Sequence, residues 1–278
     1  MLSFRPAPLA LYAATAGGIG LAVQGVVLHH PVPLTVALPY LGAYVALLAA
    51  GTAMPSLQLW GDALCSVPGG RGVALTFDDG PHPEHTPRVL DVLAAHRARA
   101  TFFMIGEKVE RHPDVVRRVA AAGHEIGSHA HRIDRRLALR GLPAIRHDLE
   151  QSVRALEAAT GARPTLFRPP YGVLNPRIFR VCDELSLDVI GWSARALDGV
   201  ARTSADEAAR RINRGLRDGA IACMHDAAEL DDRRPVIADA LPAIFAALAR
   251  SQLAAVTVSE LIASAPDASS DQGASPGP

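Results

Sequence analysis

The chain begins with an uncharged run: residues 6–61 contain no Asp, Glu, Lys or Arg. At about 1.5 Å per residue, this run is long enough for two helical crossings of a hydrocarbon core about 30 Å thick. Two histidines and two prolines interrupt it at residues 29–33 (HHPVP), which suits a turn in the headgroup region. We therefore expect a two-helix membrane hairpin over residues 1–61, with helices near 8–28 and 34–57.

Two other interpretations of this segment are a cleaved signal peptide and a pair of buried helices in a soluble domain. The apolar stretch is longer than the roughly 7–15 residues of a signal peptide, and no convincing cleavage site follows it. A long run without charge is also hard to solvate on any face. Arg5 and Arg71 flank the hairpin and lean toward placing both ends in the cytoplasm. We expect a membrane protein, of a bacterial inner membrane, and the face of its remaining domain stays open.

Charge separates this hairpin from the rest of the chain. The whole sequence balances 28 Lys and Arg against 28 Asp and Glu, which argues against nucleic acid as a partner. Only two of these charges fall within the first 70 residues, so the remainder has the charge density of an ordinary soluble domain. We expect a linker at 62–70, one domain at 71–262 and a disordered tail at 263–278.

The three cysteines, Cys65, Cys182 and Cys223, are odd in number and form no C-x-x-C pair. Neither a disulfide framework nor a zinc–cysteine site is indicated. We interpret them as free and mostly buried thiols, with Cys223 a core residue.

Within residues 71–262, short apolar runs alternate with longer segments of helical periodicity, a pattern typical of βα units around a buried parallel sheet. Strands are expected at 73–77, 100–105, 124–128, 165–168, 187–192, 220–224 and 254–258. Helices are expected at 84–97, 113–122, 141–160, 175–185, 204–217 and 234–250. The pattern predicts a closed or nearly closed β/α barrel. An open doubly wound sheet is the second choice, because no glycine-rich phosphate loop follows the first strand.

Polar residues follow several of these strands. They occur at residues 76–81 (TFDDGP), 128–131 (SHAH), 168–172 (RPPYG) and 225–226 (HD). In a parallel barrel the C-terminal strand ends meet at one rim, where reactive groups belong. Adjacent strand residues point to opposite faces, so Asp78 and Asp79 share a site only where the strand gives way to a turn. Two neighbouring carboxylates suggest one cation ligand and one general base.

These residues resemble the NodB-type polysaccharide deacetylases of carbohydrate esterase family four. The similarity covers about residues 71–262 and rests on four motifs, at 76–81, 123–129 (GHEIGSH), 168–172 and 224–226 (MHD). The resemblance implies a distorted seven-stranded β/α barrel. It also implies metal-dependent removal of an N-acyl group, usually acetyl, from an amino sugar. The expected partners are therefore an N-acetylated glycan or glycolipid and, through the hairpin, membrane lipid.

By the same resemblance, Asp78 is the general base, and His225 is the general acid for the leaving amine. Arg168 orients Asp78. The backbone N–H of Tyr171, which follows Pro170, faces the developing oxyanion. Such chemistry is coherent, because a cation polarises the amide carbonyl while the base takes a proton from water.

The metal site is where the sequence departs from the family. The resemblance assigns Asp79 and His129 as ligands of a divalent cation, zinc or alternatively cobalt or nickel. The family has a second histidine four residues after the first, and here that position is Ile133. Since catalytic zinc sites normally have three protein ligands, His131 is a candidate substitute after a local backbone shift. Otherwise His131 is an exposed side chain.

A second departure lies after residue 192. Where the family has an Asp, this chain has Arg195, which is either a contact for a phosphate or carboxylate or a solvated surface residue. The leading hypothesis is a membrane-bound amide hydrolase acting on an N-acetylated polysaccharide or lipid-linked sugar. The alternative is a pseudoenzyme that keeps the barrel as a carbohydrate-binding module with an altered metal site.

Overall fold

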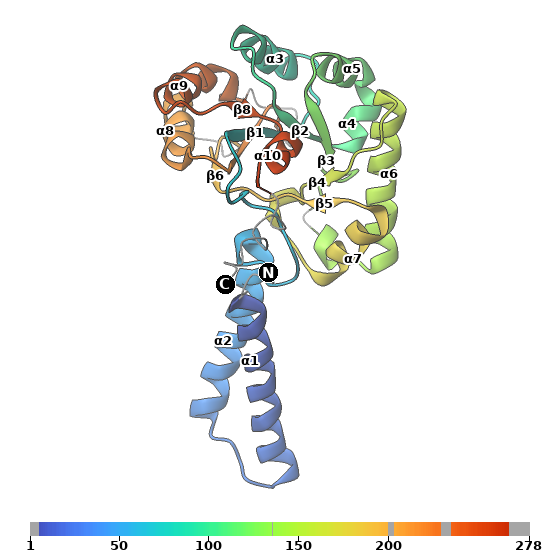
Figure 1. Ribbon diagram of the computed structural model, residues 1–278. Coiled ribbons are helices and arrows are strands. Elements are labelled where there is room, and N and C mark those ends of the chain that lie inside the picture. Colours follow the sequence, from blue (N-terminus) through green and yellow to red (C-terminus); the bar gives the residue numbers. More distant parts are fainter. Residues whose placement is uncertain (1–5, 135, 200–202, 229–234, 267–278) are drawn as a thin grey trace, which may run out of the picture.

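A computed structural model describes residues 6–134, 136–199, 203–228 and 235–266 of the chain. Its main body is a parallel β/α barrel with a two-helix hairpin projecting from one side (Figure 1). The strands are β1 (Val73–Asp78), β2 (Thr101–Met104), β3 (Glu125–Ser128), β4 (Leu166–Phe167), β5 (Asp188–Val189), β6 (Ala194–Arg195), β7 (Ala220–His225) and β8 (Ala255–Val256).

The strands follow the order β5-β4-β3-β2-β1-β7-β6, with β8 paired to the start of β1. Every strand-to-strand pairing is parallel. Strand β1 lies at the centre, and all six of its residues are buried, as expected for a strand covered on both faces. In the described part of the chain β5 and β6 do not pair, so the barrel is open on that side.

Helices cover the outside of the barrel (Figure 1). They are α3 (His85–Ala95), α4 (Gly106–Arg111), α5 (Pro113–Ala121), α6 (Leu142–Thr160), α7 (Pro176–Leu185), α8 (Ala205–Gly215) and α9 (Ile237–Arg250). The last helix, α10 (Val258–Ala263), lies instead at the end of the barrel where β2 and β3 begin, and its Leu261 packs with Ala74 and Ile221. Asn175 caps α7 by accepting from Ile178 N–H, and Ser204 caps α8 by accepting from Glu207 N–H. Each side-chain oxygen satisfies a backbone donor that a helix start leaves free.

The segment between the hairpin and β1 is built into the barrel. Leu64 forms a parallel bridge with Ile190, and Ser66 forms an antiparallel bridge with Ala220. Leu64 N–H donates to Val189 O at 2.8 Å, and Gly191 N–H donates to Leu64 O at 2.9 Å. The predicted linker at 62–70 therefore spans the opening from β5 to β7.

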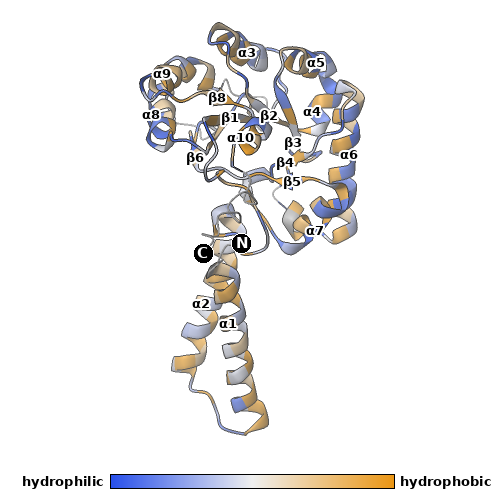
Figure 2. Ribbon diagram, viewed as in Figure 1, coloured by the Kyte–Doolittle hydropathy of each residue, from blue (hydrophilic) through white to orange (hydrophobic). Residues whose placement is uncertain are grey.

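The hairpin consists of α1 (Pro6–Ala22), a π-helical turn (Val23–Val27), α2 (Leu34–Ala53) and a 3-10 turn (Pro55–Leu57). Two spans, Ala7–Val27 and Leu34–Ala53, are long and apolar enough to cross a membrane. Apolar colour runs around both helices, and the turn between them lies farthest from the barrel (Figures 1 and 2). Because only 0% and 6% of these spans are buried, they are not core helices of a soluble domain.

The barrel confirms the sequence prediction of its architecture. All seven expected strands occur, and β6 is an additional strand of two residues. The helices α4 and α10 were not predicted. Arg5, position 234 at the expected start of α9, and residues 267–278 of the expected tail lie outside the described residues.

Candidate active site

A pocket of about 350 Å³ opens at the C-terminal ends of β1, β3, β4 and β7. Its lining includes Asp78 and Asp79 from β1 and the turn after it, His129 after β3, and His225 at the end of β7. The loop after β4 contributes Pro169, Pro170, Tyr171 and Gly172, and the remaining lining residues are Ile133, Trp192, Arg195, Leu197, Gly199 and Cys223. The predicted catalytic residues therefore converge on one rim.

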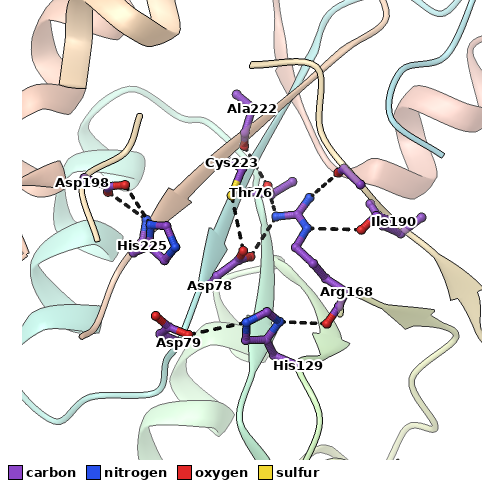
Figure 3. A network of polar contacts seen from close by, with 11 residues as sticks. Thr76, Asp78, Asp79, His129, Arg168, Ile190, Asp198, Ala222, Cys223 and His225 are labelled. Carbon is purple, nitrogen blue, oxygen red and sulfur yellow. Dashed lines mark hydrogen bonds and ion pairs between the residues drawn. The ribbon is translucent and has the colours of Figure 1, made fainter. Parts of the chain in front are cut away.

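Arg168 lies fully buried beneath the pocket and holds Asp78 in place (Figure 3). Its Nη1 donates to Asp78 Oδ1 at 2.8 Å and to Thr76 Oγ1 at 2.6 Å. Its Nη2 donates to Gly191 O at 2.9 Å, and the guanidinium carbon lies 4.2 Å from the centre of the Phe103 ring. Through these hydrogen bonds, the Arg168 guanidinium orients one oxygen of the Asp78 carboxylate and compensates the buried negative charge of Asp78.

The other oxygen of Asp78 accepts from a thiol. Cys223 Sγ lies 3.3 Å from Asp78 Oδ2. Burial, and next the negative charge of Asp78, raise the pKa of Cys223 well above its ordinary value. The thiol therefore stays protonated and donates. The structure thus confirms that Cys223 is a buried core residue with a free thiol, and it adds the contact with Asp78, which the sequence did not predict.

Asp79 and His129 face one another across the pocket. Asp79 has a φ of 72°, which turns its side chain out of the alternation of the strand, as the adjacent carboxylates require. Asp79 Oδ1 lies 3.5 Å from His129 Nε2, while His129 Nδ1 donates to Arg168 O at 2.8 Å. Nε2 and the carboxylate both carry lone pairs, so this arrangement needs a proton or a metal cation between them.

The pKa of Asp79 is lowered. Burial alone would raise it, but the hydrogen bond with His129 and the positive charges of His225 and Lys108 outweigh that effect. The carboxylate is therefore ionised and available as a ligand. A histidine fixed through its other ring nitrogen by a carbonyl is typical of metal ligands, so the pair Asp79 and His129 fits a divalent cation.

The candidate substitution by His131 is not supported. Its backbone is fixed by Gly106 N–H donating to Ala130 O and Glu107 N–H donating to His131 O, each at 3.0 Å. His131 N–H also donates to Asp148 Oδ2. The imidazole packs beneath the start of α4 and is absent from the pocket lining. The residue that lines the pocket is Ile133, so the donor set around Asp79 and His129 has two protein ligands.

His225 is held by Asp198. Its Nδ1 lies 2.8 Å from Asp198 Oδ1, and its backbone N–H donates to Asp198 Oδ2 at 2.9 Å (Figure 3). Burial by itself lowers the pKa of His225, but the charge and hydrogen bond of Asp198, together with Asp79 and Asp78, raise it to about 10. The ring is an imidazolium at neutral pH. The sequence alone assigned no role to Asp198.

The Asp226 carboxyl group packs against the turn that follows β1. Thr86 Oγ1 donates to its Oδ2, and a Cβ at Gly80 would lie 2.5 Å from the same oxygen. Burial is the main cause that raises the pKa of Asp226 to about 7. Gly80 is therefore needed for the close approach of the turn to this carboxyl group.

Comparison with known proteins agrees with this geometry. Residues 66–190 match the family "Polysaccharide deacetylase". A peptidoglycan-N-acetylglucosamine deacetylase of Bacillus cereus is 34% identical over 192 residues, covering 68% of this chain and 87% of the relative. Peptidoglycan-N-acetylglucosamine deacetylase PgdA of Listeria monocytogenes is 38% identical over 154 residues, covering 55% of this chain and 32% of the relative. The chain thus spans about a third of that relative.

Solved structures share the fold. A cobalt complex of a family 4 acetyl xylan esterase from Clostridium thermocellum has a TM-score of 0.63 and 31% identity, covering 70% of this chain and 92% of the other. A mutant, with restored enzymatic activity, of a CE4 family pseudoenzyme from Bacillus anthracis has a TM-score of 0.65 and 26% identity, covering 74% and 73%.

A parallel β/α barrel with paired carboxylates, histidines and a buried arginine at its C-terminal rim defines a domain of the NodB type. The chain belongs to the polysaccharide deacetylase family.

Proposed function

We propose that this protein is a membrane-anchored hydrolase that removes N-acetyl groups from an amino-sugar glycan or glycolipid. One observation carries the proposal: Asp78 and His225 occupy the same register position on adjacent strands β1 and β7 and are held in opposite charge states. Arg168 orients the carboxylate, and Asp198 keeps the imidazole protonated. A base and an acid on neighbouring strands suit the two proton transfers of amide hydrolysis.

A divalent cation, zinc, cobalt or nickel, is part of this proposal. Asp79 and His129 would hold it, and the Arg168 carbonyl keeps the imidazole turned toward it. When bound there, such a cation polarises the amide carbonyl and lowers the pKa of water. Two protein ligands are fewer than the three of most catalytic zinc sites, so we expect weak retention of the metal.

The other steps of amide hydrolysis are carried out by residues of the pocket. Asp78 takes a proton from the water that attacks the carbonyl carbon, and the Tyr171 backbone N–H donates to the oxygen that becomes negative. As the carbon–nitrogen bond breaks, His225 gives its proton to the amine, so that acetate and a free amino sugar leave. Asp198 holds the ring of His225 in place throughout.

The alternative function, a carbohydrate-binding pseudoenzyme, rests on Ile133 in the pocket wall. A binding module has no need of a buried arginine compensating Asp78, or of a carboxylate that keeps His225 charged. Buried charges carry a desolvation cost of several kcal/mol per ion. The retention of both pairs favours the enzyme.

Acetate release tests the proposal. Full-length protein in detergent, loaded with zinc, cobalt or nickel, is expected to release acetate from N-acetylated amino-sugar oligomers. Asp78→Asn keeps an acceptor for Arg168 but removes the base, so activity should fall about 10²- to 10⁴-fold. Asp91→Asn, on an exposed position of α3, serves as the matched control. No acetate from any loaded form, or full activity in Asp78→Asn, would contradict the proposal.

A further inference from the structure

The junction of the hairpin with the barrel is a packed joint. Leu174 N–H, after the loop that lines the pocket, donates to Thr52 O in the last turn of α2 at 2.9 Å. Trp60 Nε1 donates to Thr52 Oγ1 at 3.2 Å. Pro55, two residues after α2, lies 3.3 Å from where Gly172 would carry a Cβ. Gly172 itself lines the pocket, so one residue separates the active-site cavity from the end of the apolar hairpin.

This joint fixes the position of the pocket relative to the hairpin. With the hairpin in a bilayer, α2 ends at the membrane surface, and its backbone contacts hold the pocket there rather than on a flexible tether. A substrate whose sugar stays close to the bilayer, because its other end is lipid, reaches such a pocket without leaving the membrane. Tyr171 on the same loop is 44% exposed, and aromatic side chains of this kind suit the membrane interface.

Arg195 supplies the second observation. It lies on β6 paired with Cys223 of β7, and both residues line the pocket. Two other charged residues of this lining are already paired: Asp78 with Arg168, and His225 with Asp198. Within the described residues Arg195 is exposed and has neither a hydrogen bond nor an ion pair. Among the residues that the structure describes, the cavity therefore carries one guanidinium without a counterion.

We propose that the substrate is a lipid-linked N-acyl amino sugar and that Arg195 binds the phosphate between its sugar and lipid. This inference rests on the proposed function. In such a molecule the phosphate is attached to the sugar carbon next to the one that carries the acylamino group. An amide at Asp78 and His225 thus places the phosphate at the rim of the same pocket. Arginine presents several donors in a fork that matches phosphate oxygens.

Kinetics on three substrates test the assignment. Full-length protein in nanodiscs is given a polyprenyl diphosphate-linked N-acetylglucosamine, water-soluble N-acetylglucosamine 1-phosphate, and a neutral N-acetylglucosamine tetramer. We expect the highest kcat/KM for the lipid-linked sugar.

Arg195→Gln should lower kcat/KM for both phosphate-bearing substrates about 10- to 100-fold relative to the neutral tetramer, mainly by raising KM. Arg195→Lys should restore part of that preference, and Arg210→Gln, on an exposed position of α8, should change nothing.

Other outcomes overturn the inference. Preference for the neutral tetramer, or an unchanged substrate ratio in Arg195→Gln, rejects the phosphate site while the deacetylase proposal stands. Equal use of the 1-phosphate and the lipid-linked sugar rejects the lipid assignment. If no substrate releases acetate, the proposed deacetylase function fails. A binding measurement then tests by itself whether Arg195 binds phosphate. Asp78→Asn protein should then bind N-acetylglucosamine 1-phosphate at least about tenfold more tightly than the Asp78→Asn, Arg195→Gln protein; equal affinities reject the site.

Discussion

At the scale of single residues, the site depends on how each functional side chain is held in place by a second group. Asp78 is held by Arg168, His129 by the Arg168 carbonyl, and His225 by Asp198. The sequence motifs predicted the first residue of each pair: Asp78, His129 and His225. The second member of the last pair, Asp198, lies 27 positions from His225 along the chain, so only the fold identifies its role.

The high pKa of His225, about 10, leads to a prediction for Asp198→Asn. Asp198 contributes the largest upward effect on this pKa, and burial, which remains, lowers it. The acid form of His225 should then be lost at a lower pH. We expect the alkaline limb of kcat/KM to move down by more than one pH unit, with activity at pH 8 reduced more strongly than at pH 6. A pH–rate profile measures both.

Asp183→Asn, on an exposed position of α7, provides a control for this profile. Its alkaline limb should coincide with that of the unmodified protein. An Asp198→Asn profile that is lowered equally at every pH would mean that Asp198 positions the ring without controlling its protonation.

At the scale of elements, periodicity predicted the long helices and the central strands well, because each buries an apolar face. It missed β6, α4 and α10, which have two, six and six residues. The two helices contain less than two full helical turns, so no period can be read from them. Strand β6 is no shorter than β4, β5 and β8, but it lacks the apolar run by which those three were predicted. Arg195 on β6 could therefore be singled out only by comparison with the family motif.

The loop after β3 explains why the metal ligands were harder to predict. The residue type at positions 129, 131 and 133 suggested several ligand sets, and the contacts of 130 and 131 with the start of α4 decided among them. Backbone hydrogen bonds between distant segments produce no pattern in the local sequence from which they could be predicted. A ligand set within a loop thus requires the fold.

Ile133→His tests the two-ligand metal site. The side chain at this position already lines the pocket that contains Asp79 and His129, so an imidazole there adds a third protein donor. We expect zinc affinity, measured by competition with a chelator, to rise at least about tenfold. Ile133→Leu, which adds no donor, should keep the original affinity, and His129→Ala should reduce it. Unchanged zinc affinity in Ile133→His would mean that the cation binds elsewhere.

At the scale of the whole molecule, the predicted boundary between hairpin and barrel does not separate two independent bodies. Leu59, Ala63 and Val67 are buried, and residues 64 and 66 bridge strands on both sides of the barrel opening. The Pro and Gly residues at 68–70 led to the prediction of a linker here. Composition does not show which apolar residues pack against a distant strand.

Two truncations separate anchoring from stability. A chain of residues 50–278 keeps the joint at Thr52 and the bridges of Leu64 and Ser66, whereas 71–278 loses both. We expect the shorter chain to melt at least about 10 °C below the longer one, since burial of each large apolar side chain stabilises by about 1.5–3 kcal/mol. Thermal unfolding followed by circular dichroism measures the difference.

Membrane fractionation gives the accompanying control. The full chain should sediment with membranes, and residues 50–278 should remain in the supernatant. Equal melting temperatures of the two truncations would show that the barrel closes without residues 64 and 66, and a soluble full chain would contradict the anchor.

The two bridges also impose an order on biogenesis. Leu64 pairs with Ile190 and Ser66 with Ala220, partners that leave the ribosome more than a hundred residues later. The hairpin is complete long before these partners exist, and contacts of such separation form late in folding. The last step in closing the barrel is therefore the docking of its two nearly finished halves onto residues 64–66, which are synthesised before either half.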